Sequence, residues 1–370
     1  MSNAMQALCN GDNPTRVAYC KAKIKESFRA AGVTVRWIEI SKAPTVTRYR
    51  VYVSARVSAV VMMDLERELE PALDSPHRVR LAESGENPRV IYVEVVNKEK
   101  TPILLRHALR FCGTFERTRM PMLCLGVDVD GAPVPARLDW MPHLLVTGMS
   151  GSGKSVLMNL LISQLAVLAS PERVNFVLFD PKRMAFSLFS RLPHLLCPVV
   201  HDAAQAGTVF ETLVDEMRAR FELLKAANAS NIEAYNSLAN QTQVHAPMSY
   251  TVLLIDEIME LMLTEEQREI NTRLLCLLAK KGPSVGIHLV IGTQHLSPIL
   301  LPRELLLLIP ARIACRLLTQ IDSKFALGVD GAETLCGNGD ALYLPSPDAA
   351  EPTRLQIAYV SPSDIKTICG

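Results

Sequence analysis

The pattern of apolar and polar residues changes character near residue 120. Before that point, alternation along 45–53 predicts a half-buried strand, helical spacing along 60–73 predicts a helix, and an apolar run at 89–96 predicts a second strand. Together these elements predict a small α+β domain. It has no evident catalytic group of residues, so a scaffold or docking role is its simplest interpretation.

After residue 120, short apolar runs alternate with helical stretches. This order is typical of a predominantly parallel sheet with crossover helices, so we predict an α/β fold for the larger part of the chain. Asp202 is a plausible N-cap for the longest helix. The predicted strands are 143–147, 174–179, 251–255, 288–293 and 312–317, and the predicted helices are 155–168 and 203–227.

Composition limits the classes of protein to consider. A chain of 370 residues, 49% hydrophobic and 21% charged, is typical of a globular protein of two domains. No apolar run approaches the roughly 20 residues that span a bilayer, so we expect no membrane segment in this chain. The net charge of +1 argues against a protein that coats nucleic acid, and any nucleic-acid contact must be local.

The first residues and the cysteines bear on processing and compartment. Ser2-Asn3-Ala4 before Met5 is typical of a cloning remnant, and no signal peptide is evident. None of the nine cysteines forms a C-x-x-C pair, and those at 197, 276, 315 and 336 lie in apolar segments. We therefore expect buried, reduced thiols and a cytoplasmic protein.

The clearest motif is G-x-x-x-x-G-K-[ST] at residues 148–155, placed between a predicted strand and a predicted helix, as the motif requires. Backbone N–H groups of such a loop wrap phosphates, Lys154 adds a positive charge, and Ser155 offers a hydroxyl to Mg²⁺. We expect ATP and Mg²⁺ to bind here. The expected nucleotide-binding residues are Gly148, Met149, Ser150, Gly151, Ser152, Gly153, Lys154, Ser155 and Val156.

Polar residues end two further predicted strands. Asp256 and Glu257 follow 251–255; Asp256 can join Ser155 in holding Mg²⁺, and Glu257 can deprotonate a water that attacks the γ-phosphate. Gln294 follows 288–293. Because parallel strands end at one edge of a sheet, Gln294 can contact the γ-phosphate, although it can also be an ordinary loop residue. The expected catalytic residues are Lys154, Asp256, Glu257 and Gln294.

Basic residues that could contact DNA are less distinctive. Lys280 and Lys281 precede Gly282 in a turn-like stretch after a helix, and Arg218, Arg220 and Lys225 lie on the long helix. Each can bind phosphate, or can simply be a solvated surface residue.

The segments together resemble the FtsK/SpoIIIE family of hexameric double-stranded DNA translocases. Weaker likeness extends upstream to PTVTRYRV from Pro44 and MLCLGVDVDGAPVPARLDWMPHLL from Met122. The stretches that carry the resemblance, in order, are MPHLLVTGMSGSGKSV from Met141, FDPKRMAFSLFSRLPHLLCPVVHD from Phe179, EMRARFELLKAANASNIEAYN from Glu216, TVLLIDEIMELM from Thr251, GIHLVIGTQ from Gly286 and RIACRLLTQIDSKFALGVDGAETLCGNGDALYLP from Arg312.

This resemblance implies a RecA-like P-loop motor domain over 121–370 and an FtsK-like α domain over 33–120, after the remnant and a helical segment in 1–32. It also implies a homo-hexamer that hydrolyses ATP and moves along double-stranded DNA through sequence-independent backbone contacts, in the bacterial cytoplasm. Chromosome segregation and DNA transfer are the tasks of such motors.

Two departures from the family stand out. Its full-length members usually have an N-terminal membrane region and a C-terminal winged-helix domain, and this chain shows neither, so we expect a motor core, naturally short or trimmed. Moreover, Pro283 stands where the family's Arg would reach the neighbouring subunit's nucleotide, and His295-Leu296 replaces an Arg-Pro pair. Proline offers no donor. Lys281 or Lys280 is our candidate for that role, which predicts a slower motor because Lys lacks the fork of Arg.

Two alternatives stay open. A coupling or secretion ATPase of the same superfamily moves single-stranded DNA or protein, and an assembly subunit would bind ATP without turning it over. Stimulation of ATP hydrolysis by duplex, by single strands or by neither would separate the duplex motor from the coupling and secretion ATPases, and equal turnover in Glu257→Gln and the parent would favour the assembly subunit.

Overall fold

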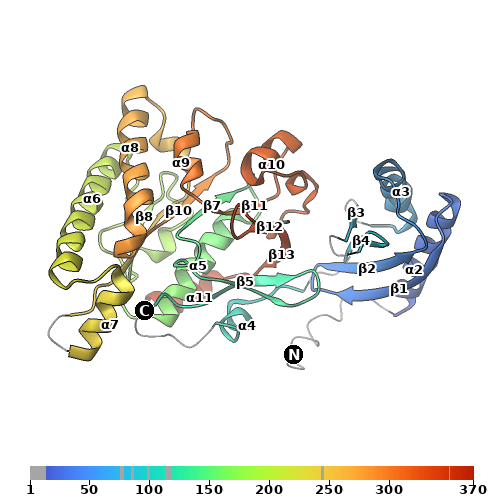
Figure 1. The fold of residues 1–370 in the computed structure, drawn as a ribbon, viewed down its shortest axis with the longest axis horizontal. Helices are drawn as coiled ribbons and strands as arrows, with labels where there is room; N and C mark the ends of the chain where they lie inside the picture. The colour runs from blue at the N-terminus through green and yellow to red at the C-terminus, as the bar shows by residue number, and fades with distance from the viewer. Residues whose placement is uncertain are drawn as a thin grey trace. The chain divides into compact units, whose positions relative to one another are not determined.

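The computed structural model of the protein describes residues 14–75, 79–84, 87–97, 101–112, 119–242, 246–349 and 351–370. They form two compact units, whose elements are drawn in Figure 1. The first unit runs to Ile103 and also contains Gly126–Val134 and Arg354–Gln356; the second contains the remainder. The expected cloning remnant lies outside the described residues.

The first unit is built on an antiparallel sheet with the strand order β1-β2-β4-β3. Alternate residues of β2 and β4 point to one face, where they pack against apolar residues of two helices, as the period of two predicts. The predicted strands and helix are confirmed to within a residue. The elements are α2 (Pro14–Ala30), β1 (Val35–Lys42), β2 (Val46–Val53), α3 (Ala59–Ala72), β3 (Arg80–Glu83) and β4 (Val90–Val96).

A buried carboxylate, Glu94, organises the opposite face of this sheet. It pairs with Arg48 at 2.7 Å and with Arg354 at 2.5 Å, and Arg48 pairs also with Asp130 at 3.1 Å. Burial raises the pKa of Glu94, but the charges of Arg354, Arg80 and Arg48 outweigh burial and hold it at about 2. These ion pairs join the segments around Asp130 and Arg354 to the sheet of the first unit.

The large sheet has the strand order β6-β5-β13-β12-β11-β7-β10-β9-β8, and the division between the units passes through β5, β6 and β13. Strands β7, β8, β9, β10 and β11 pair with one another in parallel, and β12 pairs with β11 in the antiparallel direction. The predicted α/β class is confirmed. The strands are β5 (Leu123–Asp128), β6 (Pro133–Ala136), β7 (His143–Thr147), β8 (Val174–Phe179), β9 (Tyr250–Ile255), β10 (Ile287–Thr293), β11 (Ala311–Cys315), β12 (Asp340–Leu344) and β13 (Thr353–Ile357).

The helices of the second unit fall into two groups. From β7 the chain passes through α5 to β8 at the edge of the sheet, and it then returns through α6 to β9 and through α8 to β10. Because crossovers between parallel strands are right-handed, opposite directions of travel place α5 on the face opposite α6 and α8. Accordingly α6 packs beside α8 (Figure 1), and α5 packs against α4 and α11. The helices are α4 (Leu105–Leu109), α5 (Lys154–Leu168), α6 (Ala203–Ala226), α7 (Ile232–Thr242), α8 (Glu265–Lys281), α9 (Arg303–Leu307), α10 (Gln320–Leu327) and α11 (Pro362–Cys369).

Helix starts follow ordinary capping chemistry. The carboxylate of Asp202 accepts hydrogen bonds from the N–H groups of Ala204 and Gln205 at 2.9 and 3.2 Å, so the predicted N-cap of α6 is confirmed. Short 3-10 helices, at Ser187–Phe189, Ile258–Leu261, Gly282–Val285 and Ala332–Thr334, connect the larger elements.

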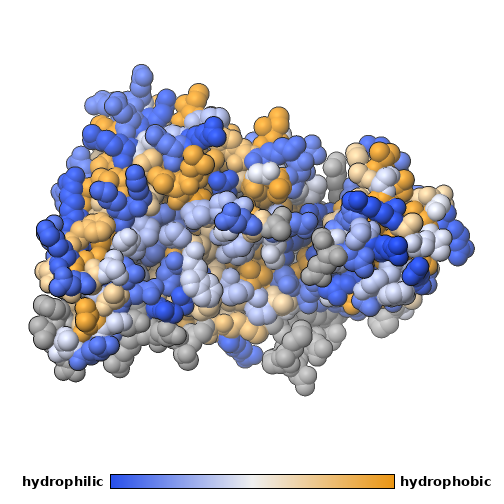
Figure 2. All heavy atoms as spheres, in the orientation of Figure 1, coloured by the Kyte–Doolittle hydropathy of each residue, from blue (hydrophilic) through white to orange (hydrophobic). Residues whose placement is uncertain are grey.

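The described helices, cysteines and surface residues bear on membrane contact and on burial. Among the described helices, none is long and apolar enough to cross a bilayer. The eight cysteines in the described part of the chain are free thiols; Cys315 and Cys336 are buried as expected, but Cys197 and Cys276 are only half-buried, because one lies in a loop and the other lines a surface hollow. Figure 2 shows polar residues over α6 and α8 and apolar residues reaching the surface near α9 and α10.

Candidate active site

The glycine-rich loop at residues 148–155 joins the carboxyl end of β7 to the first turn of α5. Its start is tied to two neighbouring strands, because the N–H groups of Gly148 and Met149 donate to the carbonyls of Thr293 and Arg316 at 3.2 and 3.0 Å. The loop therefore places the N-terminus of α5 at the edge where the parallel strands end. A helix N-terminus is a favourable site for an anion.

The second half of the loop rests on a glycine turn from much later in the chain. Gly339 donates its N–H to the carbonyl of Ser152 at 2.8 Å, and Asn338 donates to that of Gly151 at 3.3 Å. Gly153 has φ +116°, and a Cβ on it would lie 2.6 Å from the Cα and N of Gly339. Glycine is thus required at 153 both for conformation and for space.

Lys154 lies beside Asp256 at the end of β9. Its Nζ donates to the Asp256 carboxylate at 2.7 Å and to the carbonyl of the same residue at 2.5 Å, and both side chains are buried. A buried charge is stable only when it is paired, so each residue compensates the other. A phosphate entering the loop would offer Lys154 an alternative anion.

Glu257 is wholly buried and turns towards β10. Its carboxylate accepts from the Thr293 hydroxyl at 2.9 Å and from the N–H of Gln294 at 3.1 and 3.3 Å. The parallel register places Ile255 opposite Ile291, so the acids after β9 meet the last residues of β10. Gly292 permits this approach, since a Cβ there would lie 2.4 Å from the Asp256 carbonyl oxygen.

Gln294 reaches the phosphate loop, as the parallel-sheet argument predicts. Its Oε1 accepts a hydrogen bond from the hydroxyl of Ser150 at 3.4 Å. Ser155 and Val156 follow Lys154 in the first turn of α5 and are half-buried. The structure thus brings the loop, Asp256, Glu257 and Gln294 together at one edge of the sheet.

Lys280 and Lys281 lie elsewhere. The sequence suggests a turn, but the structure makes them the last residues of α8, because the 3-10 helix of Gly282–Val285 follows directly. This helix end adjoins the amino ends of β7 and β10, since the Ala279 carbonyl contacts His143 Nε2 at 2.8 Å. With seven residues in β10, the two exposed lysines are roughly 20 Å from the loop of their own chain.

The two arginines of α6 differ sharply. Arg218 is exposed and pairs with Asp215 at 2.8 Å. Arg220 is buried and donates to the carbonyls of Ser249 and Val285 at 2.8 and 3.0 Å, as well as to the Thr251 hydroxyl at 3.0 Å. Arg220 is therefore a structural clamp, a buried side chain that joins α6 to Ser249, Thr251 and Val285. Because its guanidinium is buried, the suggested contact with DNA phosphate is wrong for this residue.

Sequence reasoning missed Thr293, Gly339 and Asp180. The buried carboxylate of Asp180, in the DPK stretch, accepts from the N–H groups of Met184 and Phe186 and so shapes the loop after β8. A glycine within an apolar strand, Gly292, is the one signal that could have pointed to the close approach of β9 and β10.

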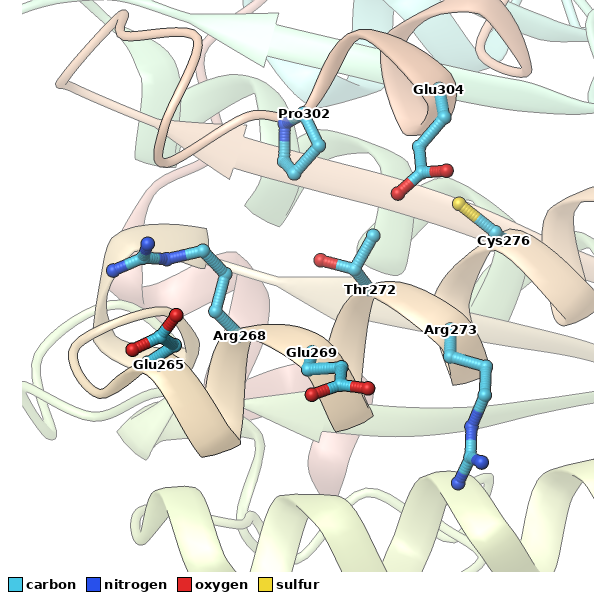
Figure 3. Close-up of a pocket in the computed structure, with 8 residues that line it drawn as sticks. All are labelled: Glu265, Arg268, Glu269, Thr272, Arg273, Cys276, Pro302 and Glu304. Atoms are coloured by element: carbon cyan, nitrogen blue, oxygen red, sulfur yellow. The ribbon is translucent and has the colours of Figure 1, made fainter.

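A separate hollow of about 610 Å³ lies between α8 and the start of α9 (Figure 3). Glu304 reaches from α9 towards Cys276 and Thr272, whereas Arg273 extends away from α9. Burial and the charge of Glu304 raise the pKa of the Cys276 thiol to about 11, so the thiol stays protonated at neutral pH. Arg268, Glu265, Glu269 and Pro302 complete the lining, which shares no residue with the phosphate loop.

Comparison with known sequences places these features in a family. A sequence model of the FtsK/SpoIIIE family matches residues 114–298, which is half of the chain and contains the phosphate loop, the strand-end acids and Gln294. The chain belongs to the FtsK/SpoIIIE family. The RecA-like P-loop fold expected from the resemblance is confirmed with it.

Two curated members of the family show how far the similarity extends. The protein named DNA translocase FtsK of Bacillus anthracis is 33% identical over 351 residues, which cover 94% of this chain and 44% of that protein. The protein of the same name from Caldanaerobacter subterraneus subsp. tengcongensis is 35% identical over 349 residues, covering 94% and 48%. The chain thus spans about half the length of these family members.

Solved structures support the fold. The cytoplasmic domain of the Thermomonospora curvata type VII secretion ATPase EccC has a TM-score of 0.62 and 25% identity over 69% of this chain and 31% of that one. The pCW3 conjugation coupling protein TcpA, in a monomer form with ATPγS, has a TM-score of 0.60 and 18% identity over 95% of this chain and 99% of that one.

Proposed function

We propose that this chain is a motor core that couples ATP hydrolysis to movement along double-stranded DNA. The observation that carries the proposal is the meeting, at one sheet edge, of Lys154 with Asp256 and of Glu257 with Gln294. Family members that carry the name DNA translocase support the choice of DNA as the track.

In this proposal the N–H groups of the loop bind the phosphates of ATP, and Lys154 exchanges Asp256 for them. Ser155 and Asp256 would hold Mg²⁺, and they fit it because hydroxyl and carboxylate oxygens are the ligands that this ion prefers. Bound Mg²⁺ would offset charge that develops on the phosphates. Glu257 removes a proton from the attacking water, and Gln294 contacts the terminal phosphate.

A ring of identical subunits, with six as the expected number, completes the proposed site. Since Lys280 and Lys281 lie far from their own loop, either can act only on a neighbour's ATP. Exposed apolar side chains offer surface that contact between subunits would cover, with Leu307 69%, Leu318 74% and Ile321 80% exposed. Replacing both lysines by Ala should lower DNA-stimulated turnover about tenfold or more, given the size of trans contacts in other NTPases.

The proposed division of labour follows the family. Residues 33–120 would form the α domain and 121–370 the motor domain, with DNA held by local backbone contacts that weaken as salt rises. The free thiols in the described part of the chain fit a reducing, ATP-rich compartment such as the bacterial cytoplasm.

The direct test is ATP turnover with linear duplex DNA, with single-stranded DNA and without DNA. The proposal expects stimulation by duplex above all, and its loss in Lys154→Ala and Glu257→Gln. Stimulation by single strands alone would favour a coupling ATPase, and indifference to DNA would favour a secretion ATPase. Equal turnover in Glu257→Gln and the parent would point to an assembly subunit.

A further inference from the structure

The position of Glu257 is unsuited to the task proposed for it. Its side chain is 0% exposed, so no water molecule can touch the carboxylate in this arrangement. A general base must lie within hydrogen-bond reach of the water that it activates, directly or through one further water. The arrangement is therefore a resting one, and Glu257 has to be released before hydrolysis.

The groups that hold Glu257 lie on β10 and the residue after it. The Thr293 hydroxyl and the Gln294 N–H both approach its carboxylate, at 2.9 Å and at 3.1 Å. Hydrogen bonds that a carboxylate accepts are stronger than hydrogen bonds between two neutral groups. These two contacts therefore favour the resting position of Glu257.

The Thr293 hydroxyl has a second acceptor available. Its Oγ1 lies 2.9 Å from the carbonyl oxygen of His295 as well as 2.9 Å from Glu257 Oε1, and it accepts from the His295 N–H at 3.1 Å. A hydroxyl carries one hydrogen, so it can donate to Glu257 or to His295 but not fully to both. Rotation of the hydroxyl would thus remove one of the two donors that hold Glu257 without leaving the hydroxyl unsatisfied, and the Gln294 N–H would remain as the other.

The same few residues contact the phosphate loop. The Thr293 carbonyl accepts from Gly148, and the Gln294 side chain accepts from Ser150. A nucleotide that displaces Ser150 would disturb Gln294, whose N–H is the other donor to Glu257.

We propose that Thr293 is a latch, a positioning residue that restrains Glu257 at rest and frees it when its hydroxyl turns to the His295 carbonyl. The inference rests on the proposed function, because it assigns Glu257 as the base. Breaking the latch should raise ATP turnover without DNA, and DNA should then stimulate it less.

The experiment is steady-state ATP turnover of Thr293→Val and Thr293→Ser, with and without saturating linear duplex DNA. Valine keeps the shape and β-branching of threonine but has no hydroxyl; serine keeps the hydroxyl. Loss of one hydrogen bond to a charged group predicts a basal kcat about tenfold higher in Thr293→Val, with KM for ATP changed less than about twofold. Thr293→Ser should restore the wild-type ratio of stimulated to basal turnover.

Three results would overturn the latch. The first is basal turnover in Thr293→Val at or below that of the parent protein. The second is raised turnover that persists in Thr293→Val with Glu257→Gln, because the gain would then not come from Glu257. The third is a Thr293→Ser variant that behaves as Thr293→Val. If the valine variant does not fold, as judged by thermal unfolding, Thr293→Ala replaces it with the same expected results.

The latch and the proposed function fail in different ways. An active parent with an unchanged Thr293→Val contradicts the latch alone. A Thr293→Val variant that hydrolyses ATP when the parent does not would support both the latch and Glu257 as the base. Turnover in neither protein contradicts both, because the latch acts only through a working base.

Discussion

Two glycines of the phosphate loop offer a matched test of how the loop is held. Gly151 and Gly153 both have positive φ, +75° and +116°, so alanine is strained at either position. They differ in space: a Cβ on Gly151 would meet nothing within 4 Å, whereas a Cβ on Gly153 would lie 2.6 Å from the backbone of Gly339. Only the second substitution should separate the loop from the glycine turn.

The magnitudes follow from these two terms. The left-handed conformation costs a residue with a Cβ about 1 to 2 kcal/mol, which is the whole effect expected for Gly151→Ala. Gly153→Ala adds the cost of overpacking, about 1 to 3 kcal/mol, since the obstructing atoms are backbone. At about 2 to 4 °C per kcal/mol, Tm should fall by a few degrees for Gly151→Ala and by about 10 °C for Gly153→Ala.

Thermal unfolding by calorimetry without nucleotide measures the difference, and amide hydrogen exchange at Gly339 locates it. The hydrogen bond from the Gly339 N–H to the Ser152 carbonyl should lose protection in Gly153→Ala and keep it in Gly151→Ala. Equal Tm values for the two variants, or an unchanged rate of exchange at the Gly339 amide, would show that the Gly339 backbone does not restrict residue 153.

Two further predictions concern charged residues. The pKa of Glu94 is about 2 in the folded protein and near 4.5 in the unfolded chain. Its contribution to the free energy of unfolding is therefore complete above about pH 4.5 and is lost as pH falls towards 2. Measured by urea unfolding, the free energy of unfolding should fall less steeply with decreasing pH in Glu94→Gln than in the parent. Arg220→Lys should lower the free energy of unfolding by about 2 to 4 kcal/mol, because lysine cannot reproduce the bonds to the Val285 carbonyl and the Thr251 hydroxyl, while Arg218→Ala on the same helix should change it by less than about 0.5 kcal/mol. An Arg220→Lys variant as stable as Arg218→Ala would contradict the clamp.

Much of the motor fold was predictable from the sequence because parallel strands carry strong local signals. Runs such as Val174–Phe179 and Tyr250–Ile255 are apolar except for Asn175 and Thr251, which is typical of strands buried on both faces. The rule that such strands end at one edge was enough to expect Asp256 and Gln294 near the phosphate loop. The structure supports that expectation through the Ser150 to Gln294 contact.

The remainder depended on contacts distant in sequence. Nothing local to Gly153 indicates that Gly339 packs on it. The helical period does place Arg220, three residues after Met217 and four before Leu224, on the apolar face of α6 and away from Arg218. It does not reveal the distant carbonyls that Arg220 binds. Likewise, Arg354 lies in the first unit, where it pairs with Glu94, a residue 260 positions earlier in the sequence. Such polar contacts leave no periodic signal, because their partners are fixed by the fold.

Movement along DNA can be measured as displacement of a triplex-forming strand from linear duplex DNA by the protein with ATP and Mg²⁺. We expect displacement that requires ATP hydrolysis and is lost in Glu257→Gln, which should still bind DNA. Binding of duplex DNA and hydrolysis of ATP by the parent protein without displacement of the third strand would contradict movement along DNA.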